Sequence, residues 1–92
     1  MNSHITAGFR KLLAALSREV RRQARSRYRQ FLENPRHPGL RFKQIHGSDR
    51  LVSVRVGREY RAVGVRRSPD EIVWFWIGTH EEYEKLLAKR LA

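Results

Sequence analysis

The sequence predicts a single α+β domain over residues 1–92, with an N-terminal antiparallel helical hairpin packed on a small antiparallel β-sheet of three to four strands and a C-terminal helix. Three observations lead to this prediction. The start of the chain has apolar residues at helical spacing, the middle has short apolar stretches separated by turn signals, and the end returns to helical spacing. Helices and strands that are segregated in this way are typical of the α+β class. A chain of 92 residues supports one modest core.

The two helices of the expected hairpin lie at the start of the chain. The first covers "FRKLLAAL", where apolar residues recur at i, i+3, i+4 and i+7 from Phe9. Ser17 can end this helix and cap the next one, which runs through "REVRRQARSRYRQFLE" to the stop signal "NPRHPGL". The second helix has an apolar inner face and a basic outer face. The basic residues at i, i+4, i+7 and i+11 are Arg18, Arg22, Arg25 and Arg29.

The second half of the chain reads as strands followed by a helix. "RFKQIH" is a short candidate strand, "LVSVRVG" alternates apolar and polar residues, and "YRAVGVRR" returns after a turn around Gly57. "IVWFWIG" is apolar at both parities, which is typical of a central strand covered on both faces. "HEEYEKLLAKRL" has helical spacing and is expected to cover one side of the sheet. Because "MNSHITAGF" contains no apolar run, no strand is expected before the first helix.

The composition excludes several classes of function. The chain has no cysteine, so it has neither a disulfide framework nor thiolate chemistry. It has no apolar run near the ~20 residues of a membrane span and no signal peptide, so a cytoplasmic location without membrane contact is expected. The four histidines are scattered and no glycine-rich phosphate loop occurs, so we expect no metal site and no cofactor.

The net charge of +11 is the strongest global signal. Such a positive field attracts polyanions, either nucleic acid or an acidic protein, although solubility or the arginine bias of a GC-rich genome could also explain it. The charge is uneven, since residues 1–50 hold twelve bases and three acids whereas residues 51–92 hold eight bases and six acids. This asymmetry favours a polyanionic partner.

The stretch "THEEY" allows two interpretations. Thr79 and Glu82 have the spacing of a capping box, so the segment can simply start a helix and let Tyr83 pack inward. However, His80 and Tyr83 are i and i+3 on the opening turn of that helix and therefore point the same way. The preceding hairpin supplies further polar side chains that neighbouring strands can bring to the same surface: Arg55, Arg58, Glu59 and Arg61.

This set of residues fits cleavage of a phosphodiester bond without a metal ion. RNA carries its own nucleophile, the 2′-hydroxyl, so an enzyme needs a base, an acid and cations around the phosphate. His80, Tyr83 and Glu59 can share the proton transfers, and Arg55 and Arg61 can hold the phosphate as bidentate donors. Additional RNA contacts are expected from Lys43, Arg58 and the basic face of the second helix. For each arginine alone, a solvated surface position is the commoner explanation.

The chain resembles toxins of the RelE/ParE superfamily of bacterial type II toxin–antitoxin modules over nearly its whole length. The resemblance runs from "ENPRHPGLRFKQIHG" through "LVSVRVGREYRAVGV" to "IVWFWIGTHEEYEKLL". It implies a small α+β toxin that an antitoxin wraps and neutralises. The RelE-like members of the superfamily cut mRNA in the ribosomal A site without a metal ion, and they use basic residues on the central strands and a tyrosine or histidine near the C-terminus.

The resemblance implies roles for particular residues. By position, Arg55 resembles one of the strand bases, Arg61 the arginine that contacts the scissile phosphate, and His80 and Tyr83 the last basic residue and the tyrosine or histidine. Ser53 stands where a RelE-like relative has a second strand lysine. The resemblance thus implies a ribosome-dependent endoribonuclease whose partners are mRNA, ribosomal RNA and an antitoxin.

Two other functions stay open at this point. ParE-like members of the superfamily resemble poisons of DNA gyrase and do not cut RNA. They generally lack the basic residues on the strands and the histidine or tyrosine near the C-terminus. An inactive relative that only binds nucleic acid or a partner is the third possibility. The net charge suits all three functions equally, whereas Arg55, Arg61, His80 and Tyr83 together favour the ribonuclease.

Overall fold

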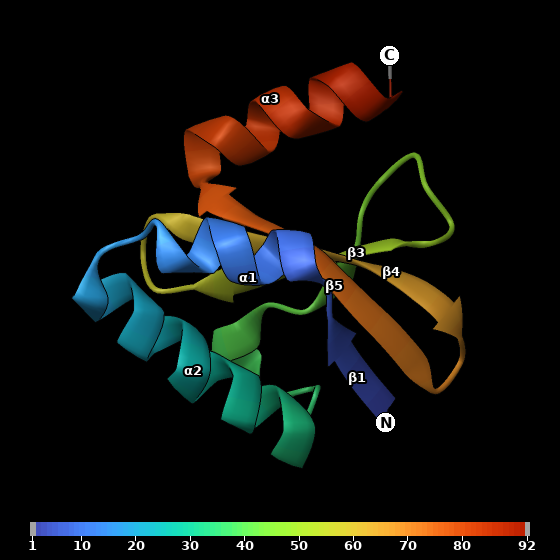
Figure 1. Cartoon of the computed structure of the whole chain (residues 1–92). Helices are drawn as coiled ribbons and strands as arrows, with labels where there is room; N and C mark the ends of the chain where they lie inside the picture. Colours follow the sequence, from blue (N-terminus) through green and yellow to red (C-terminus); the bar gives the residue numbers. More distant parts are fainter. Residues whose placement is uncertain (1, 92) are drawn as a thin grey trace.

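The computed structural model describes residues 2–91 and confirms the α+β class. The elements in chain order are β1 (Asn2–Ile5), α1 (Ala7–Ala14), α2 (Arg18–Glu33), the 3-10 helix η1 (Pro38–Leu40), β2 (Lys43–Gln44), β3 (Leu51–Val56), β4 (Tyr60–Ser68), β5 (Glu71–Thr79) and α3 (His80–Leu91). One five-stranded sheet runs in the order β1-β5-β4-β3-β2 and forms the middle layer (Figure 1).

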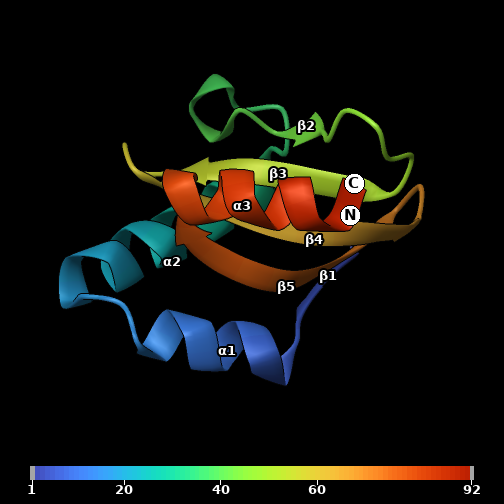
Figure 2. The same cartoon turned by 90° about the horizontal axis from the view of Figure 1, so that it is seen from above.

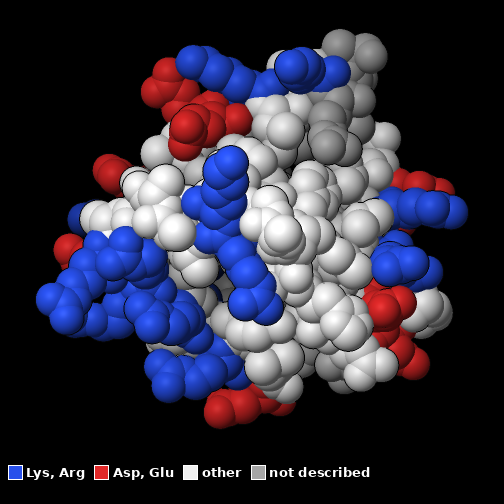
Figure 3. Space-filling view, in the orientation of Figure 1, with Lys and Arg blue, Asp and Glu red and all other residues white. Residues whose placement is uncertain are grey.

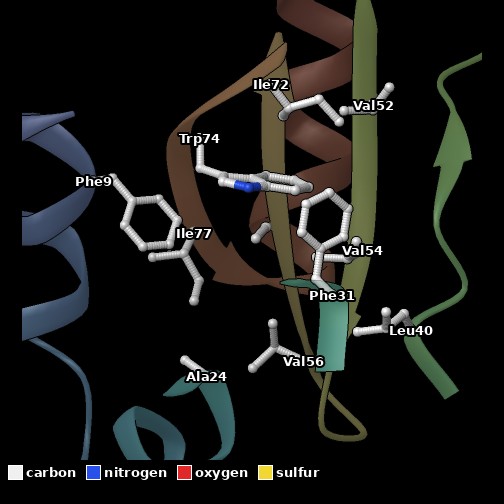
Figure 4. Packing of buried hydrophobic residues seen from close by; sticks show 11 residues of the cluster. Phe9, Ala24, Phe31, Leu40, Val52, Val54, Val56, Ile72, Trp74 and Ile77 are labelled. Atoms are coloured by element: carbon white, nitrogen blue, oxygen red, sulfur yellow. The ribbon is translucent and has the colours of Figure 1, made fainter. Parts of the chain in front are cut away.

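The helices cover the two faces of this sheet unequally (Figure 2). The face under α1 and α2 carries the main hydrophobic cluster, in which Phe31 packs edge-on against Trp74 at a ring-centroid distance of 5.3 Å. Figure 4 shows this cluster, with labelled side chains from α1, α2, η1, β3 and β5 pointing toward one another. The face under α3 carries a smaller cluster built around Ile45, Val63 and Tyr83.

Local sequence signals set the boundaries of α1 and α2. Thr6 caps α1 by accepting from the Phe9 N–H at 3.0 Å, and Ser17 caps α2 by accepting from the Val20 N–H at 3.3 Å. The helices diverge from their connection, so that α1 lies against β5 whereas α2 lies against β3 and η1 (Figure 1). The two helices of the predicted hairpin therefore pack on different parts of the same face of the sheet.

The apolar stretch of β5 packs on both faces, as its composition predicts. Ile72, Trp74 and Ile77 belong to the main cluster, whereas Trp76 packs against the smaller one. A register shift in the pairing of β4 and β5 occurs between Val63 and Gly64. Because of this shift, even-numbered residues of β5 before it and odd-numbered residues after it point to the same face of the sheet.

Two expectations about the sheet are wrong. The segment before the first helix does form a strand, and β1 pairs in parallel with β5, so the sheet is mixed and has five strands rather than three or four antiparallel ones. The strand is stabilised by polar groups instead of an apolar run. The Ser3 hydroxyl accepts hydrogen bonds from Trp74 Nε1 at 3.0 Å and from the Tyr28 hydroxyl at 3.1 Å, and the Thr6 N–H donates to the Trp74 carbonyl at 3.0 Å.

No helix in residues 2–91 is both long enough and apolar enough to cross a lipid bilayer.

Candidate active site

The junction between β5 and α3 anchors the candidate site. The Thr79 N–H donates to Glu82 Oε1 at 2.8 Å, and the Glu82 N–H donates to Thr79 Oγ1 at 3.1 Å, which is the predicted capping box. The backbone N–H of Thr79 is the main cause that lowers the pKa of Glu82 below its ordinary value, and the Thr79 side chain adds to this effect. The first turn of α3 is therefore held to the end of the central strand.

His80 is the exposed member of the site. Its side chain is 55% exposed, and its Nε2 lies 3.3 Å from Oε1 of Glu84, one helical turn later. Its backbone N–H donates to the Glu59 carbonyl at 2.7 Å, which ties the start of α3 to the turn between β3 and β4. This bond joins the backbones of Glu59 and His80, and the Glu59 side chain is exposed.

Tyr83 lies beneath His80 and points into the molecule. Its side chain is only 4% exposed, and its hydroxyl lies 3.5 Å from Oγ of Ser53. The rings of His80 and Tyr83 stack with centroids 6.0 Å apart, so the two residues do share one side of the helix. Tyr83 belongs to the smaller hydrophobic cluster, which means that its hydroxyl is covered in this structure.

Arg61 carries the most unusual feature of the site. Its guanidinium lies over the Tyr83 ring, 5.7 Å from the centroid. Its Nη1 is shielded from solvent and has no hydrogen-bond partner. A buried donor without an acceptor costs about 1–3 kcal/mol, so this atom marks a place where an external acceptor would be stabilising.

Arg55 lies directly opposite Arg61 in the pairing of β3 and β4. Like charges at opposed positions repel each other. The Arg55 side chain turns toward the β3–β4 turn, where its Nε donates to the Gly57 carbonyl at 3.0 Å. Two cations therefore share one corner of the sheet, and neither forms an ion pair with a carboxylate among the residues that the structure describes.

The other predicted RNA-contacting residues fall into two groups. Arg58 is exposed in the β3–β4 turn next to Glu59, and Lys43 is exposed on β2 opposite Ser53, so both lie on the elements that form the site. The four arginines of the predicted basic face of α2 line a separate shallow hollow together with Tyr28. Figure 3 shows Lys and Arg side chains gathered over α2, whereas both charges alternate on α3. Since α2 and α3 cover opposite faces of the sheet, the structure does not bring the α2 arginines to His80.

Two residues of the site were not identified as members from the sequence. Glu84 lies four residues after His80 on the same helix, and this i, i+4 spacing was a signal that could have revealed the pair. Ser53 is the only buried polar residue within the described chain, and it contacts Tyr83 across thirty residues of sequence. No local pattern predicts that contact.

The described residues contain no group of three or more histidine, cysteine, aspartate or glutamate side chains that could hold a metal ion. The donors at the site are guanidinium groups, which repel cations. The arrangement is suited to binding an oxyanion and to proton transfer by His80.

Comparison with known proteins relates the chain to one protein family and to several solved structures. Residues 18–85 match the family model described as the ParE-like toxin domain. A search of curated proteins found no match. Among solved structures, the chain is similar to the RelB–RelE antitoxin–toxin complex from Methanococcus jannaschii, with a TM-score of 0.67, 18% identity and coverage of 90% of this chain and 96% of that chain.

Two further structures share the fold. One is the isolated RelE toxin from E. coli, with a TM-score of 0.64, 18% identity and coverage of 98% of both chains. The other is a copper-bound mutant toxin from Helicobacter pylori, with a TM-score of 0.57, 17% identity and coverage of 89% of this chain and 97% of that chain. At such identities these similarities establish the fold.

Proposed function

The chain belongs to the ParE-like toxin domain family of the RelE/ParE superfamily, the toxins of toxin–antitoxin systems, and from this premise we propose that it cleaves mRNA on the ribosome without a metal ion. The observation that carries this proposal is that the unpaired guanidinium of Arg61 and the exposed ring of His80 both lie against the ring of Tyr83. An arginine donor without an acceptor suits a phosphate oxygen, and a histidine suits proton transfer near neutral pH.

The chemistry follows from the RNA substrate. A base removes the proton of the 2′-hydroxyl, the 2′-oxygen attacks the phosphorus, and the 5′-oxygen of the next nucleotide leaves with a proton from an acid. The products are a 2′,3′-cyclic phosphate and a free 5′-hydroxyl. In this proposal His80 and Glu59 share the proton transfers, and Arg61 and Arg55 stabilise the negative charge on the phosphate oxygens.

Tyr83 has a conditional role in this scheme. Its ring covers the Arg61 guanidinium, so a phosphate reaches Arg61 only if Tyr83 moves aside. In that movement its hydroxyl leaves Ser53 and becomes available to the substrate. A proton-transfer role for Tyr83 therefore requires a displacement of the first turns of α3.

The ribosome supplies what this small site lacks. Holding the reacting groups in position can contribute several kcal/mol of the barrier reduction, up to roughly 7–11 kcal/mol in the best cases. A site with few catalytic groups is sufficient when the mRNA is already positioned. The described arginines, which have no carboxylate partners, offer contacts to ribosomal RNA phosphates.

A cognate antitoxin is part of the proposal. The similar M. jannaschii structure is a complex of an antitoxin with a toxin. Since this chain carries a net charge of +11, we expect its antitoxin to present acidic and apolar residues. We expect them to cover the sheet corner and α3, which blocks His80.

Inhibition of DNA gyrase without catalysis is the second candidate function. Two observations favour it: the matching family model is described as ParE-like, and Tyr83 is buried rather than presented to solvent. On this reading, toxicity survives the loss of His80 and depends on surface contacts.

The deciding experiment is cleavage of an mRNA on purified translating ribosomes by wild-type protein and by His80→Ala. We expect cuts at A-site codons that decrease by about 10²–10⁴-fold in the variant. His4→Ala is a matched control, because His4 is similarly exposed and lies 3.2 Å from Glu71, yet belongs to β1. Cleavage that persists in His80→Ala would remove His80 from the mechanism. No cleavage by the wild type, together with inhibition of gyrase supercoiling, would establish the second candidate.

A further inference from the structure

We propose that an arginine-lined groove beside η1 binds the phosphodiester backbone of the RNA strand that reaches His80. This η1 groove consists of two adjoining hollows that share Pro38 and Arg41. Its basic and aromatic side chains are Arg27, Arg55, Arg58, Arg36, His37, Arg66 and Phe42. The inference rests on the proposed function, because it names a surface along which the same RNA strand continues.

The charge of the η1 groove is not neutralised by the protein. No carboxylate side chain lines either hollow, and no arginine of the described chain lies within ion-pair distance of a carboxylate. The contacts of the groove arginines are to neutral oxygens: Arg27 donates to Gln30 Oε1, Arg55 to the Gly57 carbonyl and Arg66 to the Pro69 carbonyl. Their remaining donors stay available for phosphate oxygens, which the planar guanidinium binds in a bidentate manner.

The backbone of Arg41 supports a functional role for its side chain. Arg41 is the only non-glycine residue with a positive φ, at 47°, in the part of the chain that the structure describes. It ends η1, a position where glycine fits without the steric cost that a Cβ imposes. An exposed arginine in this conformation costs stability and gains no ion pair, and it lies where the two hollows meet.

One end of the η1 groove lies at the β3–β4 turn, which also contacts the candidate active site on the other side of the sheet. Arg55 precedes this turn and Arg58 lies in it, and the Glu59 carbonyl of the turn accepts the His80 N–H. At the far end, the Arg66 N–H donates to the Arg50 carbonyl, just before β3 begins. The groove thus follows the length of β3, whose six residues span roughly 20 Å at about 3.3 Å each. This length suits a short run of nucleotides.

The far end of the groove also offers flat surfaces for bases. The Arg66 guanidinium lies over the Phe42 ring at 5.7 Å from its centroid. His37 Nδ1 accepts from the Gly39 N–H at 3.1 Å, which leaves Nε2 as the proton-bearing nitrogen of the neutral ring. Single-stranded RNA is recognised by such combinations of aromatic or guanidinium planes with phosphate contacts, whereas an acidic peptide needs only the charges. The combination therefore favours RNA over an acidic peptide.

The test compares two charge-matched double variants. Arg41→Gly with Arg58→Gln removes two groove cations, and Arg10→Gln with Arg67→Gln removes two exposed cations outside the groove. The probe is a fluorescent single-stranded oligouridylate of about 12 nucleotides, 2′-O-methylated so that the toxin cannot cleave it. Binding is measured over a series of salt concentrations. Urea unfolding of each variant verifies the fold, and we expect the Arg41→Gly pair to be at least as stable as the control pair.

We expect the groove pair to bind the probe more weakly and its plot of log K against log salt to be less steep by about 1.4, since each lost phosphate contact removes about 0.7 from the slope. The control pair should keep the wild-type slope. Equal changes in both pairs would show that net charge alone determines binding and would overturn the proposal. Loss of antitoxin binding with unchanged RNA binding would also overturn it and assign the groove to a protein.

The readout separates this inference from the proposed function, because binding of an uncleavable probe does not require catalysis. If the groove pair lowers the slope of log K against log salt but the wild type cuts no ribosome-bound mRNA, the proposed function is refuted and RNA binding by the η1 groove is supported. If mRNA is cleaved normally and the groove pair leaves the slope unchanged, only the proposal that the η1 groove binds RNA is refuted.

Discussion

Arg61 is the residue of the candidate site at which stability and the proposed function make opposite demands. Its strand neighbours Ala62 and Val63 are buried, and its own Nη1 is shielded from solvent without an acceptor. The contact with the Tyr83 ring offsets part of this cost, because a cation–π contact contributes about 0.5–1 kcal/mol when exposed and about 2 kcal/mol when desolvated. The contact leaves Nη1 itself without an acceptor, and an anion could supply one.

Arg61→Met should therefore separate stability from toxicity. We expect the free energy of unfolding to rise by about 1 kcal/mol, because the unpaired buried donor is replaced by an apolar chain of similar length. Growth inhibition should be lost. Urea unfolding and a growth assay measure the two effects, and Arg67→Met on the exposed end of the same strand is the control that should change neither. A loss of more than about 1 kcal/mol would mean that Arg61 has a structural role.

At the scale of elements, the capping box at the start of α3 determines where His80 stands. Thr79 and Glu82 exchange two hydrogen bonds, and the His80 N–H is bonded to the neighbouring turn. α3 otherwise contacts the sheet through the smaller hydrophobic cluster. The first turn is thus the part of this helix with the most directional contacts.

Thr79→Ala should destabilise the protein by about 1 kcal/mol, the usual cost of losing an N-cap.

The contribution of Glu82 to stability should depend on pH. Because hydrogen bonds from Thr79 lower the pKa of Glu82 in the folded state, its stabilisation is fully present above the ordinary value of 4.5 and is lost as the pH falls through the lowered folded-state pKa.

The measurement is the unfolding free energy of wild type and of Glu82→Gln as a function of pH. The difference between the two should be constant near neutral pH and should shrink in acid. Glu81→Gln is the control, since Glu81 has only an exposed partner, Lys85, at 3.6 Å. A difference that grows as the pH falls would contradict the assignment.

At the scale of the whole molecule, the arginine side chains that the structure describes have no carboxylate partners. The three ion pairs of the described chain involve His4, His80 and Lys85, and no arginine takes part in one. With a net charge of +11, repulsion between the arginines opposes folding at low ionic strength. A surface of this kind is stabilised by bound polyanions.

Salt should therefore stabilise the free protein. We expect the melting temperature to rise between about 0.01 M and 0.5 M NaCl, because the screening length falls from roughly 30 Å to a few Å and repulsion weakens. Thermal unfolding followed by circular dichroism measures this rise. A melting temperature that falls with salt would mean that attractive pairs, rather than repulsion, dominate the surface.

The fold and part of the site could be predicted from the sequence because they depend on neighbours that are close in the chain. Helical spacing located α1, α2 and α3, alternation located β3, the turn around Gly57 located the start of β4, and the spacing of Thr79 and Glu82 predicted the capping box. The missed strand β1 had no such signal. Its stability comes from Ser3, which bonds to Tyr28 and Trp74 far along the chain.

The sequence by itself determined the α+β class, the net charge of +11 and the helix start after Thr79, since these follow from composition and from residues close together in the chain. Only the tertiary structure decided that Tyr83 is buried against Ser53, that Arg61 Nη1 lacks an acceptor and that the α2 arginines lie on the opposite face from His80. These features depend on strand register and on which helix covers which face. Such pairings between distant segments are set by the packing of the whole core, and no local pattern encodes them.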